Sequence, residues 1–557
     1  MSAPRTRQRH MCTFTPFVIG GFARIVMGGA PAPPDPAGFV EQAAERGLTY
    51  FVTQNAGAGR GVACVDLDGD GDVDVITLGA ADGVVGVFEN DGGGYFKDRS
   101  GACGLPILNS ASGVSAADYD ADGDLDLYFT CWLAANVLAR NDGGLQFKEV
   151  GSAAGVADVG DATGMAWGDY DGDGWLDLYV CNIYWPNRLY RNLGDGTFTD
   201  TAFDLGVAYL GFSWDAVFFD YDGDGDADLY VSNDKGHGSG GQRHNYLFEN
   251  TGGQFEDVTG ASGTAAYIDS MGITVGDFDH NGFPDLYCTN IQLGNVLFMN
   301  NGDKTFTEAG EDAGVLSNAI GWGAAFFDGH NDGELNLFVC NQSARNRLYD
   351  VPGAWPCVDL MPPGLEAVDS YVVACADIDH DGDLDLIEQS YLQPIRLYVN
   401  QTDGARHWIQ FRVADGWPNL DAIGAVVRVR KGASWQMREV MAGGVYKAHS
   451  DSTLHFGLDQ AEVVEETRAS WPRGETRTLT GYGADRAWRL LPAALLGDAD
   501  FDGDIDRHDW RVLRDCLEAL LFEPGCEMFD FDGDADVDLL DLLAMLREAA
   551  RLPVSPN

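Results

Sequence analysis

The chain has 557 residues and a formal net charge of −52, yet 45% of its residues are hydrophobic and 11% are aromatic. That apolar content supplies a large core, which argues against the disordered polyanion that such a charge would otherwise suggest. Only 35 residues are Lys or Arg, too few to favour a nucleic-acid partner, because nucleic-acid binding depends on neutralising phosphates. No uninterrupted apolar run reaches the roughly 18 residues that a membrane span needs.

Residues 1–32 have features of a secretory signal. Arg5, Arg7 and Arg9 give a basic start, a modest apolar stretch follows, and small residues around Ala30 offer a cleavage site. Arg24 interrupts the apolar stretch, which leaves a disordered N-terminus as the alternative. We expect a protein that is secreted, held at the cell surface or exported to a periplasm.

An aspartate-rich loop occurs seven times, in copies such as DLDGDGDVDV from Asp66 and DYDGDGWLDL from Asp169. The first aspartates are separated by 52, 51, 51, 57, 51 and 49 residues, which indicates a tandem repeat. In the unit at 164–200, two runs of strand formers flank the loop, and two further runs follow around a GDG turn. Four short antiparallel strands per unit predict the blades of a β-propeller, since the periodicity of a helical solenoid is absent.

The loop pattern D-x-D-x-D-G-x-x-D is typical of a calcium site. Carboxylates at positions 1, 3, 5 and 9 converge, position 7 adds a carbonyl oxygen, and glycine at position 6 allows a sharp turn. Many hard oxygen ligands suit Ca²⁺, whereas Mg²⁺ requires a tighter octahedron and zinc prefers His or Cys. Counting two loops near the C-terminus, nine loops hold 42 of the 87 acidic residues. We expect roughly six to nine Ca²⁺ ions per chain.

The predicted ligand sets differ between loops. Five loops carry all four carboxylates: Asp66, Asp68, Asp70 and Asp74; Asp118, Asp120, Asp122 and Asp126; Asp169, Asp171, Asp173 and Asp177; Asp220, Asp222, Asp224 and Asp228; and Asp377, Asp379, Asp381 and Asp385. The fifth loop in chain order has an amide at position 5, and its set is Asp277, Asp279, Asn281 and Asp285. The sixth loop keeps only Asp328 and Asp332, because His330 and Asn336 occupy positions 3 and 9, so we expect it to be weak or empty.

These units resemble the FG-GAP/VCBS repeats of integrin-α-type propellers. The resemblance implies a seven-bladed β-propeller over residues 33–404, with calcium in a hairpin loop on one face. A phenylalanine such as Phe96 or Phe147 precedes the next loop by 22 residues in five units and marks the outer strand. Phe39 resembles this position, so we expect residues near 38–50 to complete the last blade and close the ring.

Residues 405–490 alternate like antiparallel strands and contain no aspartate loop. The motifs NLDAIG from Asn419, HFGL from His455 and WPRG from Trp471 resemble the ASPIC/UnbV domain that follows such propellers in cartilage acidic proteins and related bacterial proteins. The resemblance implies a small β domain, and it brings no established chemistry.

Residues 491–557 contain two twelve-position loops, each followed by an amphipathic helical pattern. They resemble a type I dockerin, a small α-helical EF-hand-like module, which implies bound Ca²⁺ and a cohesin-like partner. Ala535 stands where glycine is expected, at a cost of about 1 kcal/mol, so the second site is expected to be weaker. Cys516 and Cys526 are candidates for a disulfide in an exported protein. The implied ligands are Asp498, Asp500, Asp502, Asp506 and Asp509, and then Asp530, Asp532, Asp534, Asp538 and Asp541.

Several conspicuous side chains have plain structural interpretations. His280 and His380, at position 4 of their loops, are expected to face solvent. Cysteines next to the loops are expected in the core, where they behave as small apolar residues: Cys64, Cys131, Cys181, Cys288, Cys340 and Cys375. Tryptophans are expected to pack within blades: Trp167, Trp175, Trp214 and Trp322.

Two functions are compatible with the sequence. The first is a calcium-binding scaffold or adhesion-type protein that binds protein or glycan ligands through the propeller and attaches through the dockerin-like module. The second is an extracellular propeller enzyme, a lyase or glycosidase acting on polysaccharide. No nucleophile elbow, HExxH motif or phosphate loop is present, so no catalytic residue is predicted. An insertion with Lys235, His237, Arg243 and His244 is either a ligand-gripping or catalytic loop or an exposed connection.

Overall fold

The computed structural model describes residues 38–53, 58–235, 244–292, 294–350, 355–361, 369–402 and 404–493. All of them belong to one compact unit, Asp35–Asn557. Their secondary structure is almost entirely β, and the helices among them are single turns, α1 (Gly151–Ala154) and α2 (Thr259–Ser262). The mainly β fold class is confirmed. The signal-like residues 1–32 and the dockerin-like residues from 494 onward lie outside the described residues.

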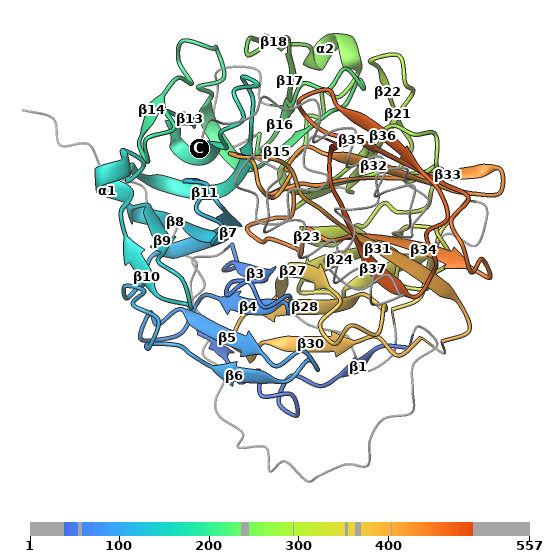
Figure 1. Cartoon of the computed structure of the whole chain (residues 1–557). Helices are drawn as coiled ribbons and strands as arrows, with labels where there is room; N and C mark the ends of the chain where they lie inside the picture. The colour runs from blue at the N-terminus through green and yellow to red at the C-terminus, as the bar shows by residue number, and fades with distance from the viewer. Residues whose placement is uncertain are drawn as a thin grey trace, which may run out of the picture. The chain divides into compact units, whose positions relative to one another are not determined.

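Each repeat folds as an antiparallel meander with the aspartate loop between its first and second strands. First strands such as β3 and β7 are buried along their whole length, so their alternating side chains fill the core on both faces. Figure 1 shows the units following one another in chain order, from β3–β6 in blue to β27–β30 in yellow. The strands are β3 (Val62–Val65), β4 (Asp74–Thr77), β5 (Gly86–Asn90) and β6 (Phe96–Asp98); β7 (Ala111–Ala117), β8 (Asp126–Ala135), β9 (Val137–Asn141) and β10 (Phe147–Glu149); β11 (Val159–Gly168), β12 (Asp177–Pro186), β13 (Arg188–Asn192) and β14 (Phe198–Asp200); β15 (Leu210–Phe219), β16 (Asp228–Asn233), β17 (Tyr246–Asn250) and β18 (Phe255–Asp257); β19 (Ser270–Gly276), β20 (Asp285–Asn290), β21 (Val296–Asn300) and β22 (Phe306–Glu308); β23 (Ile320–Phe327), β24 (Asn336–Gln342), β25 (Arg347–Asp350) and β26 (Val358–Asp359); and β27 (Ser370–Ala376), β28 (Asp385–Ser390), β29 (Gln393–Pro394) and β30 (Arg396–Val399).

The ring closes by pairing the two ends of the repeat region. β1 (Val40–Glu41) pairs antiparallel with β30 and supplies the fourth strand of the unit that begins with β27. β2 (Phe51–Val52) pairs with β29, and the first strands β27 and β3 are in contact. The prediction that residues near 38–50 complete the last blade is confirmed.

Hydrogen bonding joins three of the units into one sheet. β8 and β12 are ten residues long and extend past their own meanders, so that β8 pairs with β11 and β12 pairs with β15. Within the described residues, the repeat region therefore has four separate four-stranded sheets, one twelve-stranded sheet and the two-stranded pair β2–β29. The predicted seven blades are not found as seven independent sheets, because the long strand ends of neighbouring units pair their free backbone groups with each other.

Two further sheets form a second β region, which we define as residues 404–493. In one sheet, β31 lies between antiparallel β34 and parallel β37, and the other has the order β33-β32-β35-β36. Phe411 and Trp471 of this region belong to the same hydrophobic cluster as Trp167 and Leu178 of the propeller, so the region packs directly on the ring. Its strands are β31 (His407–Val413), β32 (Val426–Lys431), β33 (Ser434–Glu439), β34 (Leu454–Asp459), β35 (Glu466–Ser470), β36 (Thr476–Leu479) and β37 (Arg486–Leu490).

A connection of the second β region, residues 440–453 between β33 and β34, enters the middle of the ring, and we call it the plug segment. The backbone of His449 pairs with β3, and the carbonyl of Ala442 accepts a hydrogen bond from Trp167 N of β11 at 2.8 Å. The side chains of Tyr446 and Lys447 are fully buried, and Lys447 Nζ lies 5.5 Å from the centroid of a Trp214 ring of β15. The second β region thereby reaches the innermost strands of the propeller.

Candidate functional site

The seven aspartate loops share one backbone conformation. Position 6 is glycine in each of them, with φ from 85° at Gly382 to 97° at Gly71. Position 4 also has a positive φ, and it carries a side chain in four loops: Ala121, His280, Asn331 and His380. The predicted turn at position 6 is confirmed, whereas the left-handed position 4 was missed, although glycine at this position in the other three loops signals it.

Carboxylate oxygens converge within the loops. In at least five loops, oxygens from three residues lie within 4.8 Å of one another. Such proximity is unfavourable for ionised groups unless a cation lies among them. The groups are Asp66, Asp68 and Asp70; Asp118, Asp120 and Asp122; Asp169, Asp171 and Asp177; Asp220, Asp222 and Asp228; and Asp277, Asp279 and Asp285.

Several of these oxygens are buried without a hydrogen-bond partner among the described residues. They belong to positions 1 and 3: Asp68 Oδ1, Asp120 Oδ1, Asp277 Oδ1, Asp377 Oδ1 and Asp379 Oδ1. Burying an unpaired charged oxygen costs free energy, whereas coordination of a divalent cation removes that cost. The donors are all hard oxygens, so the residues present fit Ca²⁺.

Position 1 organises each loop through its second oxygen. In the second loop, Asp118 Oδ2 accepts from Gly123 N at 2.9 Å, and Asp118 Oδ1 accepts from Asp122 N at 3.1 Å. Burial raises the pKa of Asp118 to about 7 and that of Asp220 to about 6. These carboxylates therefore lack a compensating positive charge when only protein groups surround them.

Position 9 has a structural role that the sequence did not reveal. Asp126 Oδ1 accepts from Asn141 N at 2.7 Å, and Asp126 Oδ2 accepts from Tyr119 N at 3.3 Å. Burial raises the pKa of Asp126 to about 9. One oxygen thus binds the loop at Tyr119 and the other binds the third strand at Asn141, so the carboxylate joins the two. The same pair of backbone hydrogen bonds is made by Asp74, Asp177, Asp228, Asp285 and Asp385.

Asparagines at the ends of third strands connect neighbouring units and were also missed. Asn141 Nδ2 donates to the Leu67 carbonyl of the preceding unit at 2.8 Å, and Asn141 Oδ1 accepts from Gly143 N at 3.2 Å. Since an asparagine precedes a glycine-containing turn at the same place in most repeats, the sequence held a usable signal. The residues that donate to the preceding unit are Asn90, Asn141, Asn192, Asn250, Asn300 and Asn400.

Basic side chains also reach three of the loops. Lys304 Nζ lies 2.5 Å from Asp222 Oδ2, Arg191 Nε lies 2.5 Å from Asp171 Oδ2, and Arg46 Nη1 lies 2.9 Å from Asp379 Oδ2. These cations balance part of the loop charge at position 3. Each is partly exposed, so its ion pair contributes little on its own.

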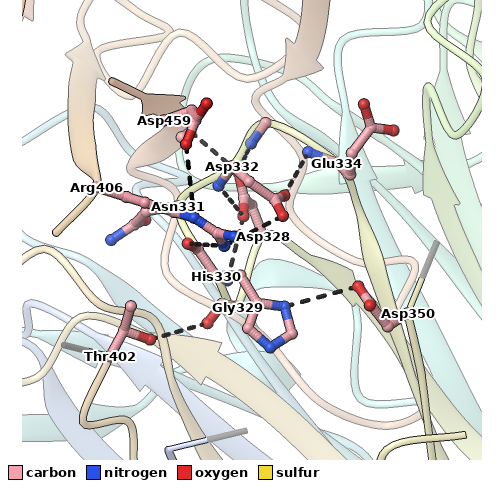
Figure 2. A network of polar contacts seen from close by, with 12 residues as sticks. Asp328, Gly329, His330, Asn331, Asp332, Glu334, Asp350, Thr402, Arg406 and Asp459 are labelled. Atoms are coloured by element: carbon pink, nitrogen blue, oxygen red, sulfur yellow. Dashed lines mark hydrogen bonds and ion pairs between the residues drawn. The ribbon is translucent and has the colours of Figure 1, made fainter. Parts of the chain in front are cut away.

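The sixth loop brings Asp328 and Asp332 together with neutral residues. Figure 2 shows that its polar groups point toward partners within the protein, among them Arg406 and Asp350. Asn336 at position 9 donates from Nδ2 to Asp350 Oδ1 at 2.8 Å. This loop has the backbone of a metal loop without its ligand set.

The second β region lies against the loops. Gln410 Nε2 donates to Asp377 Oδ2 at 2.8 Å, and Arg412 Nη1 lies 3.9 Å from Asp66 Oδ2. Glu439 accepts a hydrogen bond from the backbone N–H of a position-1 aspartate, Asp220, at 3.2 Å. A cavity of about 460 Å³ separates the region from the loops at Asp66 and Asp118. The loop face of the propeller is therefore largely an intramolecular interface.

Of the remaining sequence predictions, some are confirmed, one is wrong and others concern residues outside the described ones. The six core cysteines are buried, and Trp167, Trp214 and Trp322 are buried as expected. The expectation that His280 faces solvent was wrong, because its Nε2 lies 3.2 Å from Glu334 Oε2 and its side chain is 15% exposed. Of the insertion, Lys235 pairs with Asp269 at 3.1 Å. His237, Arg243, the Cys516 and Cys526 pair and the ligands from Asp498 to Asp541 lie outside the described residues.

Antiparallel meanders with aspartate loops define a β-propeller of a known kind. A family model described as FG-GAP-like repeat matches residues 52–129, 169–231, 236–288 and 277–339. A second model, described as ASPIC and UnbV, matches residues 417–494. The chain thus combines a propeller of FG-GAP-like repeats with an ASPIC and UnbV segment, as the sequence predicted.

Among curated proteins, the chain is similar to Cartilage acidic protein 1. The protein from Xenopus tropicalis is 27% identical over 428 residues, which are 69% of this chain and 63% of that protein. The Mus musculus protein is 26% identical over 435 residues, with 68% and 62% covered, and the Homo sapiens protein is 25% identical over 323 residues, with 49% and 46% covered. The chain spans less than two thirds of the length of these relatives.

Similar solved structures include Saccharomyces cerevisiae Sqt1, with a TM-score of 0.41, 11% identity and coverage of 64% of this chain and 98% of that chain. The WD40 beta propeller domain of Doa1 has a TM-score of 0.38 and 12% identity, with 64% and 97% covered. Among the described residues, no helix is long or apolar enough to cross a lipid bilayer.

Proposed function

We propose that this chain is an extracellular calcium-binding scaffold whose propeller binds a protein or glycan partner. The observation that carries the proposal is the set of buried, unpaired carboxylate oxygens in loops where three acidic residues converge. Calcium would be held by positions 1, 3, 5 and 9 of each complete loop, with a backbone carbonyl from position 7. Its chemistry there is structural, because it neutralises carboxylates and fixes the hairpin.

The partner surface in this proposal is the face opposite the loops. The second β region covers the loop face and the plug segment occupies the middle of the ring, which leaves the other ends of the strands for binding. Large apolar side chains gather on those ends in neighbouring paired strands, and they are half or more exposed: Leu133, Val159, Tyr184, Trp185 and Leu210. Exposed apolar residues on adjoining elements are typical of interaction sites.

Backbone strain supports the choice of this face. Leu133 has φ 55° and Tyr184 has φ 63°, at equivalent irregularities in the pairing of strands β8 and β12 in successive units. A bulky residue in the left-handed region costs about 1 to 2 kcal/mol relative to glycine. Leu133 is 73% exposed, so packing does not offset that cost. A role in binding a partner explains why large side chains occupy these strand positions.

The proposal assigns the propeller no catalytic role, since its acidic clusters are metal-ligand sets rather than isolated acid and base pairs. It also assigns the dockerin-like residues 491–557 an attachment role through a cohesin-like partner. The similarity to Cartilage acidic protein 1 supports an extracellular location.

Metal counting and thermal unfolding of the full chain test the calcium assignment. We expect roughly six to nine Ca²⁺ ions per chain after dialysis against trace calcium, and a large fall in Tm when a calcium-selective chelator is added. Magnesium at the same concentration is the control, and it should not restore the Tm. An unchanged Tm with little bound metal would overturn the assignment.

A further inference from the structure

The sixth loop keeps the backbone of the other loops but not their chemistry. Asn331 at position 4 has φ 55° and Gly333 at position 6 has φ 93°, as in the complete loops. His330 and Asn336 replace the carboxylates at positions 3 and 9. The backbone conformation that cradles a cation therefore persists where half of the carboxylate ligands are gone.

Protein donors occupy both oxygens of the remaining position-1 carboxylate. Asp328 Oδ2 accepts from Gly333 N at 2.7 Å and from Gly457 N at 3.1 Å, and Asp328 Oδ1 accepts from two further N–H groups of its own loop. Asp328 is 1% exposed. In contrast, Asp277 and Asp377 at position 1 of the flanking loops each retain a buried oxygen without a hydrogen-bond partner among the described residues. The second β region donates to Asp328 through Gly457 N and to Asp377 through Gln410 Nε2, but only Asp328 of these two has hydrogen-bond donors on both oxygens.

Position 5 of the sixth loop is bound by cations from the second β region. Arg406 Nη1 donates to Asp332 Oδ2 at 3.2 Å and to the His330 carbonyl at 2.9 Å, and Lys431 Nζ donates to the Asp332 carbonyl at 2.8 Å. The partly buried Arg438 guanidinium also acts on Asp328 electrostatically. Arg406, Lys431 and Arg438 therefore bring three positive charges to this loop. In a calcium loop the positive charge would come from the divalent ion.

Positions 4 and 9 of the loop, Asn331 and Asn336, also have hydrogen-bond partners within the protein. Asn331 Oδ1 lies 2.7 Å from His455 Nε2, and Asn331 O accepts from Asp459 N at 2.9 Å (Figure 2). Other units have Asp at position 9 and Asn at the end of the third strand. In this unit the two residue types are swapped, as Asn336 and Asp350. Asn336 Oδ1 accepts from Gly329 N at 2.8 Å, so the hairpin hydrogen bond survives the exchange.

Gly457 shows that the contact depends on a close approach. A Cβ built at this position would collide with Asp328 Oδ2 and with the backbone of Asn331. His455 and Gly457 both belong to the HFGL motif, which the sequence analysis singled out without assigning it a role. The motif therefore fits the sixth loop specifically.

We propose that the sixth loop has exchanged its calcium for protein donors and is the socket in which the HFGL motif docks the second β region onto the propeller. The occupant is the segment 454–459, with Arg406 and Lys431 as clamps on the rim. That the sixth loop binds no calcium is meaningful only if the other loops bind it, so this half rests on the proposed calcium function. The docking part stands on contacts within the chain.

The metal half is tested by matched position-1 variants of the full chain. Asp220→Asn removes a carboxylate whose oxygens accept only from its own loop, and it should lower the calcium count by one ion per chain. Asp328→Asn should leave the count unchanged. Loss of one ion from Asp328→Asn would overturn the exchange. If neither the parent protein nor the variants bind calcium, the proposed calcium function fails, whereas the docking half is decided separately.

The docking half is tested by hydrogen exchange of Gly457→Ala in the full chain. Amides in residues 440–459 should exchange about tenfold faster or more, because the charge-assisted hydrogen bond to Asp328 is lost. Gly483→Ala is the matched control, since a Cβ there meets nothing within 4 Å, and it should leave exchange unchanged. Should Gly457→Ala fail to fold, Arg406→Gln provides the milder readout, with faster exchange expected in the same residues. Parent-like exchange in Gly457→Ala or in Arg406→Gln would overturn the docking role.

Discussion

The two faces of this propeller are built from the same hairpins but treat their side chains in opposite ways. On the loop face, position-1 carboxylates such as Asp118 and Asp328 are almost fully buried, and the second β region lies over them. On the other face, Leu133 and Tyr184 extend into solvent from positions in β8 and β12 with positive φ. The loop face uses its polar groups for internal contacts, whereas the opposite face exposes large apolar side chains: Leu133 is 73% exposed, and Tyr184 contacts the Phe212 ring yet is 65% exposed.

The difference indicates that the loop face serves stability and the opposite face serves binding. Changes on the loop face should alter unfolding free energy and metal content. Changes on the opposite face should alter partner binding and leave stability the same or better. Each prediction below measures one side of this division.

Calcium removal should have the largest effect. A site that binds calcium only in the folded state stabilises the protein by about 4 kcal/mol when free calcium is a thousand times Kd. Several loops acting together should therefore lower the Tm strongly on chelation. Differential scanning calorimetry at two calcium concentrations checks this, and a Tm independent of calcium would contradict it.

Asn141→Ala should be the next largest change. Its side-chain amide donates to carbonyls of its own and the preceding unit, and Asn141 is fully buried. Leaving those carbonyls unpaired costs about 2 to 3 kcal/mol. Urea unfolding in saturating calcium measures the loss. Gln146→Ala, at an exposed turn of the same unit, is the control and should change stability by less than about 0.5 kcal/mol.

Acidification should weaken the plug segment through His449. Burial lowers the pKa of His449 to about 4, while its ring accepts from Ala116 N at 3.1 Å. The folded state keeps the ring neutral and the unfolded state protonates it near pH 6.5, so the contribution is present above that pH and is lost as pH falls toward 4. We expect a loss of about 2 kcal/mol by pH 5.

The variant His449→Gln separates the pH dependence that comes from His449 from the pH dependence that comes from the acidic loops. Glutamine keeps an acceptor oxygen but does not titrate. The difference in unfolding free energy between pH 7 and pH 5 should therefore be smaller in the variant than in the parent. Equal pH dependence in the two proteins would show that His449 does not carry the effect.

Sequence reasoning succeeded where a residue's role is local. The spacing of the aspartates gave the repeat, the hairpin and the closing strand around Phe39, because strand formers and turn residues act over a few positions. It failed for Asp126 and Asn141, whose partners lie in another strand or another unit. It also read the sixth loop as a defective metal site. One of the donors to Asp328 is the N–H of Gly457, 129 residues away, and no local pattern indicates it.

Leu133→Gly should have the smallest effect on stability and the most informative sign. Leu133 has φ 55° and is 73% exposed, so glycine relieves strain without removing buried contacts, and stability should rise by up to about 1 kcal/mol. The same substitution at Leu193, which is 50% exposed and has no positive φ, should lower stability by a similar amount, as glycine adds unfolded-state entropy. Urea unfolding distinguishes the two variants. If Leu133→Gly is destabilising, the backbone at this position of β8 is not strained and the argument for a partner surface there loses its support. If it is stabilising, leucine is retained at this position at a cost in stability, as expected for a side chain that is kept for binding.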